Sequence, residues 1–185
     1  MEILKVGQDD LITMCKRGDP AAYNGLYEQH SAVVYNTILR LVEHTGEAED
    51  ILQESFIIAF QKINDFKNTG GFRAWVKRIE INKSVDLLRR RKIRYVELEA
   101  GQMREDDDEM VDEDAFEYKM DIVMAAVAAL PEGYRTVFNL YAVENIPHIE
   151  IAQMLGLEHN AVRTQYHRAK HKVLNTLKKG GYCER

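Results

Sequence analysis

The 185-residue sequence predicts an all-α protein: two small helical domains joined by an acidic flexible linker, with a helix-turn-helix as the C-terminal domain. Apolar residues recur at helical spacing on both sides of the chain, and only 3 prolines and 11 glycines are available for turns. Residues 97–121 interrupt this pattern with 12 acidic and 2 basic residues. The flanking segments, 1–96 and 122–185, carry net charges of +2 and +3. We therefore expect one domain on each side, because charge repulsion and few apolar residues keep an acidic stretch from packing.

Several classes of protein are disfavoured. The start, MEILKVGQDDLITM, has no basic segment followed by an apolar core, so we expect no signal peptide. No apolar run approaches the ~18 residues that a membrane-spanning helix needs. Cys15 and Cys183 lie near opposite ends of the chain and match no metal-binding spacing, which is typical of two reduced thiols in a cytoplasmic protein.

The elements before the linker are all expected to be helices. The first surrounds Leu11. Asp19 and Pro20 favour the start of the next, as its cap and first residue, and the amphipathic pattern then runs through Val42 as one or two helices. After a break at residues 44–46, the segment EAEDILQESFIIAFQKINDF is expected to be a further helix. Its inward residues are Ile51, Phe56, Ala59, Phe60 and Ile63, and Asp50, Gln53, Glu54 and Gln61 project elsewhere.

A loop signal at residues 68–71, NTGG, precedes a long helix that begins near Phe72. Residues 73–94 carry nine bases and two acids, and the aromatic residues Phe66, Phe72 and Trp75 flank the loop. Aromatic rings beside a basic track suit the binding of single-stranded nucleic acid, whose unstacked bases can stack on the rings. A protein that recognises only duplex DNA does not need such rings. Alternatively, Phe72 and Trp75 are core residues and the arginines form a solvated face. For Trp75 alone we favour the core; for the whole cluster we favour nucleic acid.

After the linker, breaks at Pro131 and Pro147 divide the chain into helices. The stretch IEIAQMLGLEHNAVRTQYHRAKHKV then places Ala152, Gly156 and Val162 at separations of four and six residues. A helix-turn-helix needs a small residue where its helices cross, a turn residue that tolerates positive φ, and an apolar anchor in the second helix. These three residues meet the three requirements, so we expect this motif here.

The second helix of the motif, from about Asn160, should expose side chains that bind phosphates or read base edges in the major groove. These side chains are Arg163, Thr164, Gln165, His167, Arg168, Lys170, His171 and Lys172. A plain helical hairpin with a solvated basic face is the alternative. We favour DNA binding because the turn pattern and the basic helix coincide.

In their order and spacing, these segments resemble the extracytoplasmic-function sigma factors of bacterial RNA polymerase. GEAEDILQESFIIAF is similar to that family's polymerase-binding helix, and FKNTGGFRAWVKRIEINKSVDLLRRR to its minus-ten recognition and melting segment. The stretch from LPEGYRTVF to YHRAKHKV is similar to its minus-thirty-five domain. The likeness covers residues 8–96 and 120–177. Matching positions in the minus-ten segment are Phe66, Phe72, Trp75, Arg78, Asn82, Asp86 and Arg90.

The resemblance implies a subunit that gives polymerase its promoter specificity through three sets of residues. The polymerase-binding set is Glu49, Asp50, Gln53 and Glu54. The minus-ten set is Asn68, Thr69, Gly70, Gly71, Phe72, Trp75, Arg78 and Asn82. The minus-thirty-five set is Asn160, Arg163, Thr164, Gln165, His167 and Arg168. Within the minus-ten set, the loop would cup a base flipped out of the stack.

The partners implied by the resemblance are core RNA polymerase, promoter DNA and an anti-sigma factor, with no direct membrane contact. The acidic linker would occupy the path toward the active-site and RNA-exit channels of polymerase. From its charge alone, the linker is either a plain solvated tether or a nucleic-acid mimic that shields a basic surface of the same chain.

Three positions depart from the family pattern. Glu158 stands where serine often caps the recognition helix, although Asn160 could serve instead. Gln165 replaces a usual cation, which removes a phosphate contact. Pro147 stands where a capping hydroxyl is common, although proline suits a first helical position. These changes leave the fold intact and bear on which promoter sequence is read.

Other kinds of chemistry find little support in the sequence. His167 and His171 lie one turn apart, with His159 nearby, but no carboxylate or thiolate completes a tetrahedral set, so we expect no metal. Without a P-loop, a nucleophile elbow or paired carboxylates we expect no enzyme and no cofactor. A stand-alone helix-turn-helix transcriptional regulator and an all-α interaction module remain as alternatives. A regulator should bind its operator without polymerase.

Overall fold

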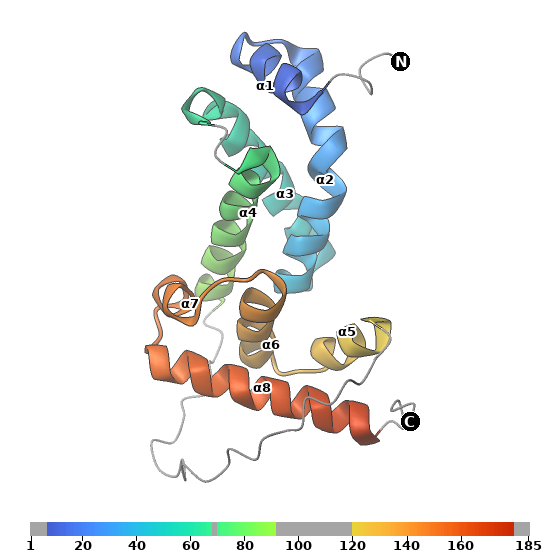
Figure 1. Cartoon of the computed structure of the whole chain (residues 1–185), viewed down its shortest axis with the longest axis vertical. Coiled ribbons are helices and arrows are strands. Elements are labelled where there is room, and N and C mark those ends of the chain that lie inside the picture. Colours follow the sequence, from blue (N-terminus) through green and yellow to red (C-terminus); the bar gives the residue numbers. More distant parts are fainter. Residues whose placement is uncertain (1–6, 68–69, 92–119, 180–185) are drawn as a thin grey trace. The chain divides into compact units, whose positions relative to one another are not determined.

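The computed structural model describes residues 7–67, 70–91 and 120–179, and these residues form helices and no strand (Figure 1). The all-α fold predicted from the sequence is therefore confirmed for the described part of the chain.

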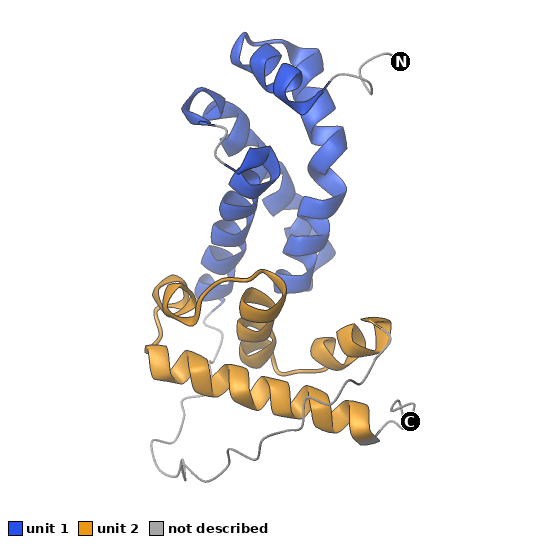
Figure 2. Cartoon of the chain, viewed as in Figure 1, with its two compact units in different colours: residues 1–91 blue, residues 92–185 orange. Residues whose placement is uncertain are grey.

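The chain divides into two compact units, residues 1–91 (unit 1) and residues 92–185 (unit 2), shown separately in Figure 2. Each unit has its own set of buried apolar side chains. Most of the predicted linker, residues 97–121, lies outside the described residues. Its last two residues, Met120 and Asp121, are the first two residues of a helix, α5 (Met120–Ala128), and do not belong to a linker.

Unit 1 is built from α1 (Gln8–Lys16), α2 (Pro20–Val42), α3 (Thr45–Gln61), the 3-10 turn η2 (Ile63–Asp65) and α4 (Gly71–Arg90). Helices α2, α3 and α4 pack against one another, and α1 packs on α2. The expected helix start at Pro20 is confirmed: the Asp19 carboxylate accepts a hydrogen bond from the Ala21 N–H at 2.9 Å. From there α2 continues as one helix to Val42.

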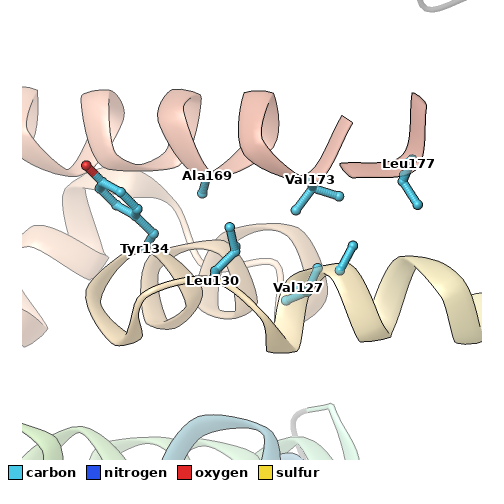
Figure 3. Packing of buried hydrophobic residues seen from close by; sticks show 7 residues of the cluster. Val127, Leu130, Tyr134, Ala169, Val173 and Leu177 are labelled. Carbon is cyan, nitrogen blue, oxygen red and sulfur yellow. The ribbon is translucent and has the colours of Figure 1, made fainter. Parts of the chain in front are cut away.

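Unit 2 is built from α5 (Met120–Ala128), α6 (Glu132–Phe138), the π-helix η3 (Asn139–Val143), α7 (His148–Leu155) and α8 (His159–Lys179). The long helix α8 packs against α5, α6 and α7. Figure 3 shows Val127 and Leu130 facing Ala169, Val173 and Leu177 of α8. The last three residues are spaced by four, so they form one stripe along α8. This stripe anchors the second half of α8 in the core of unit 2.

The predicted helix-turn-helix is formed by α7 and α8. Gly156 ends α7 in the left-handed region, with φ 68° and ψ 36°. The Leu157 N–H donates to the Ala152 carbonyl at 2.9 Å, which closes the turn. Ala152 and Val162 are both buried, and α7 packs against α8. The positive φ predicted at Gly156 is confirmed, and the burial of the other two residues agrees with their predicted roles.

Candidate nucleic-acid and protein interfaces

The outer face of α3 carries the residues predicted to bind polymerase. Glu49, Asp50, Gln53 and Glu54 are all exposed. Ile57, the next residue on this face, is 54 % exposed although it is apolar. The opposite side of α3 is buried against α2 and α4. The face thus surrounds one exposed apolar side chain with carboxylates and an amide, as the polar rim of a protein–protein interface surrounds its apolar centre.

Sequence reasoning did not single out Ile57, although a signal was present. Ile57 follows Gln53 by four residues and Glu54 by three, so helical geometry places it on the polar face. Glu54 already has a partner, because Lys83 of α4 donates to its carboxylate at 2.9 Å. The Lys83 and Glu54 side chains are 36 % and 57 % exposed, so this ion pair adds less than about 1 kcal/mol to stability.

The aromatic residues around the loop of the minus-ten set, residues 68–71 (the minus-ten loop), point into unit 1. Phe72 is 0 % exposed, and its ring centroid lies 6.0 Å from those of both Phe66 and Trp75. This burial favours a core role for Phe72, which heads the buried stripe of α4 that continues through Val76; its contact with nucleic acid stays a prediction. Trp75 is partly exposed, with its ring 5.1 Å from that of Phe66.

The loop itself is only partly described. Gly70 and Gly71 both have positive φ, 95° and 82°, a conformation that a residue with a Cβ rarely adopts. Asn68 and Thr69 lie outside the described residues. The loop leads into α4, where Arg78 is exposed on the outer surface.

The outer face of α4 presents Arg78 together with Asn82, one turn further along and also exposed. A guanidinium followed by an amide at this spacing can hydrogen-bond base edges and phosphates on one side of a helix. Arg90 continues the exposed basic character toward the end of α4.

Several bases of the predicted basic track have partners inside unit 1. Both terminal nitrogens of Arg73 donate to the buried Glu80. Arg91 pairs with Glu47 and donates to the Val42 carbonyl at 3.1 Å. The track is therefore less available to nucleic acid than its net charge suggests.

Four of the six residues predicted for minus-thirty-five DNA are exposed on α8. Asn160, Arg163 and His167 follow one another at separations of three and four, so they share one face. Arg168 is exposed beside them. This face holds amide, guanidinium and imidazole groups, all of which can hydrogen-bond base edges or phosphates.

The other two residues, Thr164 and Gln165, are buried, so the expectation that they are exposed is wrong. Gln165 stands three residues after Val162 and four before Ala169, which places it on the anchoring side of α8, where it is 1 % exposed. The Thr164 hydroxyl donates to the Asn160 carbonyl at 2.9 Å. Neither side chain belongs to the exposed face of α8.

An aromatic cluster joins η3, α7 and α8, and the sequence analysis did not identify it. The rings of Tyr141 and His148 stack with centroids 3.9 Å apart, and Tyr166 of α8 lies 4.5 Å from Tyr141. Burial lowers the pKa of His148 below its usual value, and the nearby His159 and Arg163 lower the pKa further. The imidazole therefore stays neutral at pH values where an exposed histidine begins to gain a proton.

Unit 2 should lose stability on acidification because of His148. The lowered pKa means that the unfolded state takes up a proton first, so this loss begins as pH falls through about 6.5 and is complete below the folded-state pKa. Replacing His148 with glutamine should reduce the pH dependence. Chemical unfolding followed by helical circular dichroism at pH 7.5 and 5.0 measures it. An equal loss in both proteins would assign the effect to other groups.

The described residues contain no cluster of three or more His, Cys, Asp or Glu side chains that could hold a metal ion. Within the same part of the chain, no helix is both long and apolar enough to cross a membrane. Burial, with a contribution from Asp19, raises the pKa of the Cys15 thiol to about 11, so this thiol remains protonated at neutral pH. Cys183 lies outside the described residues.

Two protein-family models match the chain. Sigma-70 region 2 matches residues 26–93, and Sigma-70, region 4 matches residues 120–173. The first match begins within α2 and includes α3 and α4, and the second begins with α5 and extends into α8. Together the two matches cover more than half of the chain.

Individual proteins agree with these matches. The ECF RNA polymerase sigma factor SigW of Bacillus subtilis (strain 168) is 28% identical over 179 residues, covering 90% of this chain and 95% of SigW. The ECF RNA polymerase sigma factor SigE of Mycolicibacterium smegmatis is 31% identical over 172 residues, covering 88% of this chain and 65% of SigE.

The solved structure titled "Structure of CnrH in complex with the cytosolic domain of CnrY" has a TM-score of 0.52 and 25% identity, covering 93% of this chain and 97% of that chain. Regions 2 and 4 of one family thus occur in order along the chain, on the two units that carry the exposed faces of α3, α4 and α8. The chain belongs to the sigma-70 family, as a sigma factor of the extracytoplasmic-function type.

Proposed function

We propose that this chain directs core RNA polymerase to promoters that carry a minus-ten and a minus-thirty-five element, and that it promotes their melting. One observation carries this proposal: both sigma-70 regions are present in order, and each lies in a unit with an exposed, chemically suitable face. Unit 1 would bind polymerase through the outer face of α3. Unit 2 would bind duplex DNA through α8.

The minus-thirty-five contacts are assigned to the exposed face of α8: Asn160, Arg163, His167 and Arg168. A helix-turn-helix places its second helix in the major groove, where arginine can bind guanine edges with two hydrogen bonds. Thr164 and Gln165 are left out because they are buried.

The minus-ten contacts are assigned to the loop before α4 and to Arg78 and Asn82 on its outer face. Glycines at positions 70 and 71 let the backbone approach a base closely. Extracting one base from the stack costs a few kcal/mol, which contacts in a pocket can offset. Trp75 is partly exposed whereas Phe72 is buried, so Trp75 is the better placed of the two to contact a base.

A protein partner that competes with polymerase is also proposed. The solved relative CnrH is in complex with the cytosolic domain of CnrY. By that likeness, an anti-sigma factor would bind this chain and withhold it from polymerase. As a subunit of the transcription machinery, the chain would act in the cytoplasm and have no catalytic activity of its own.

The proposed function is tested by transcription with bacterial core polymerase, with and without this protein, on templates whose upstream sequence is randomised. Transcripts that start downstream of one selected pair of motifs would support the proposal and define the promoter. A protein that adds nothing to core polymerase, yet retains a duplex site by itself, would instead be a stand-alone regulator.

Changes on the outer face of α3 should weaken polymerase binding without unfolding unit 1. Replacing Asp50 with arginine should lower the affinity for core polymerase about tenfold or more, and so should replacing Ile57 with lysine. A loss of this size is typical when a residue at the centre of an interface is replaced. Competition against a labelled wild-type chain measures the affinity. Asp10→Arg on α1 is the control, because it makes the same charge change at another exposed site of unit 1. Unchanged affinity in both α3 variants would exclude this face.

A further inference from the structure

The first turn of α4 has no capping side chain to fix it. Gly70 occupies the N-cap position and offers no hydrogen bond to the N–H groups at the start of the helix. Gly70 and Gly71 also allow many backbone conformations in the unfolded chain. Because the loop proposed to hold a minus-ten base leads directly into this turn, a polar interaction made by the turn's own side chains bears on the position of the loop.

A buried polar network provides that interaction. Glu80 is 0 % exposed, and its two carboxylate oxygens accept hydrogen bonds from the terminal nitrogens of Arg73 at 3.0 and 2.7 Å. One of these nitrogens also donates to the hydroxyl oxygen of Thr37 at 3.3 Å. Thr37 belongs to α2, so the network links the first turn of α4 to another helix.

Thr37 is held in one orientation by its own contacts. Its hydroxyl accepts a second hydrogen bond, from Arg40 at 3.3 Å, and donates to the Val33 carbonyl at 3.1 Å. A hydroxyl group has one donor and two acceptor positions, and all three are used here. The acceptor that Arg73 meets on α2 is therefore fixed in direction.

The burial of the Glu80 carboxylate favours one fixed position of the Arg73 guanidinium. A fully buried carboxylate that lost its partner would be strongly destabilising, so Glu80 holds the guanidinium in place. Arg73 also acts on its other neighbour in α2: burial and the charge of Arg73 lower the pKa of His30. Although Arg73 is one of the nine bases in the basic track, its guanidinium is neutralised within unit 1.

We propose that Arg73, Glu80 and Thr37 are positioning residues that set the first turn of α4 against α2, and through it the loop that holds the minus-ten base. Arg73 influences promoter recognition through this loop and makes no contact with DNA. This inference rests on the proposed function, because it assigns a role to the same loop.

The first test uses Thr37→Val, which removes the link to α2 without leaving the Glu80 carboxylate unpaired. Holoenzyme is titrated with single-stranded oligonucleotides that carry the selected minus-ten sequence or one substituted base. We expect Thr37→Val to lower the preference for the selected sequence about 2- to 30-fold, the range seen when a coupled network is altered. Thr37→Ser, which keeps the hydroxyl, should retain the preference.

The ratio of the affinities for the selected and the substituted oligonucleotide distinguishes a positioning role from a loss of stability. A variant that is merely less stable would bind both oligonucleotides less well and would also bind core polymerase less well, leaving the ratio unchanged. That result would overturn the proposal. A wild-type ratio for Thr37→Val would overturn it as well. If wild-type holoenzyme selects no sequence at all, the proposed function fails, and this outcome is distinct from both.

The second test asks whether Arg73 contacts DNA. If it bound a phosphate, Arg73→Lys would keep that contact, and Arg73→Gln would reduce the salt dependence of promoter binding by about one released ion. The proposal predicts the opposite pattern: an unchanged salt slope for Arg73→Gln and a reduced sequence preference for Arg73→Lys. It also predicts that Arg73→Lys with Glu80→Gln is less harmful than the sum of the two single changes. A reduced salt slope, or strict additivity, would overturn it.

Discussion

Replacing Phe72 with alanine should lower the free energy of unfolding of unit 1 by about 3–5 kcal/mol. The side chain is 0 % exposed and its ring packs against those of Phe66 and Trp75, so alanine would leave a cavity that these rings cannot readily fill. Small domains are stable by about 5–15 kcal/mol in total, so the loss is a large fraction. Trp75 is the only tryptophan in the chain, and its fluorescence during denaturant unfolding reports on this unit.

The matched control for this change is Ile57→Ala. Ile57 is 54 % exposed in the same unit, so removing its side chain should change the free energy of unfolding by no more than about 0.5 kcal/mol. Phe72→Leu should fall between the two, because leucine fills part of the cavity. If Phe72→Ala cost less than about 1 kcal/mol but abolished minus-ten binding, Phe72 would be a DNA contact after all.

A holoenzyme that carries Arg163→Ala should bind its selected promoter about 5- to 150-fold more weakly, the equivalent of one lost bidentate base contact of 1–3 kcal/mol. Arg163 is exposed on the second helix of the motif, on the same face as Asn160 and His167. The loss should appear only on templates with an intact minus-thirty-five element. Binding to the promoter, and to a promoter with that element scrambled, measures the difference.

Lys178→Ala is the control for this experiment. It removes one positive charge from the far end of α8, where the side chain is exposed, and should leave promoter selectivity unchanged. If Arg163→Ala weakened binding to both templates equally, Arg163 would bind a phosphate and carry no sequence information. If it changed neither, the exposed face of α8 would not be the DNA-binding face.

The helices were predictable from the sequence because their start and stop signals are local. Pro20 begins α2, and Pro131 and Pro147 stand immediately before α6 and α7. Gly156 ends α7 with the positive φ that its place in the spacing required. Such signals act within a few residues and do not depend on which helices pack together.

Burial was harder to predict because it depends on neighbouring helices. An aromatic residue next to a glycine loop fits a DNA contact and a core position equally well, and only the packing of α4 shows that Phe72 is buried. Gln165 illustrates a different difficulty. Its spacing from Val162 and Ala169 indicated the buried side of α8, but its polar character favoured an exposed interpretation.

The polar network could not be predicted from local pattern at all. Arg73 and Glu80 are seven residues apart, and Thr37 lies 36 residues before Arg73. The charge count along α4 suggested a basic surface, whereas pairing inside the unit neutralises part of it. The exposed residues of α3, α4 and α8 remain predicted contacts, whose partners the experiments above identify.

Because each unit folds around its own core, thermodynamic linkage should act on one unit at a time. A ligand present at a hundredfold excess over its dissociation constant stabilises the unit it binds by about 2.7 kcal/mol and should leave the other transition where it was. The tryptophan signal follows unit 1, and the remaining loss of helical signal follows unit 2. Thermal unfolding of the wild-type chain in the presence of a DNA fragment or a protein partner would then show which unit each of them binds.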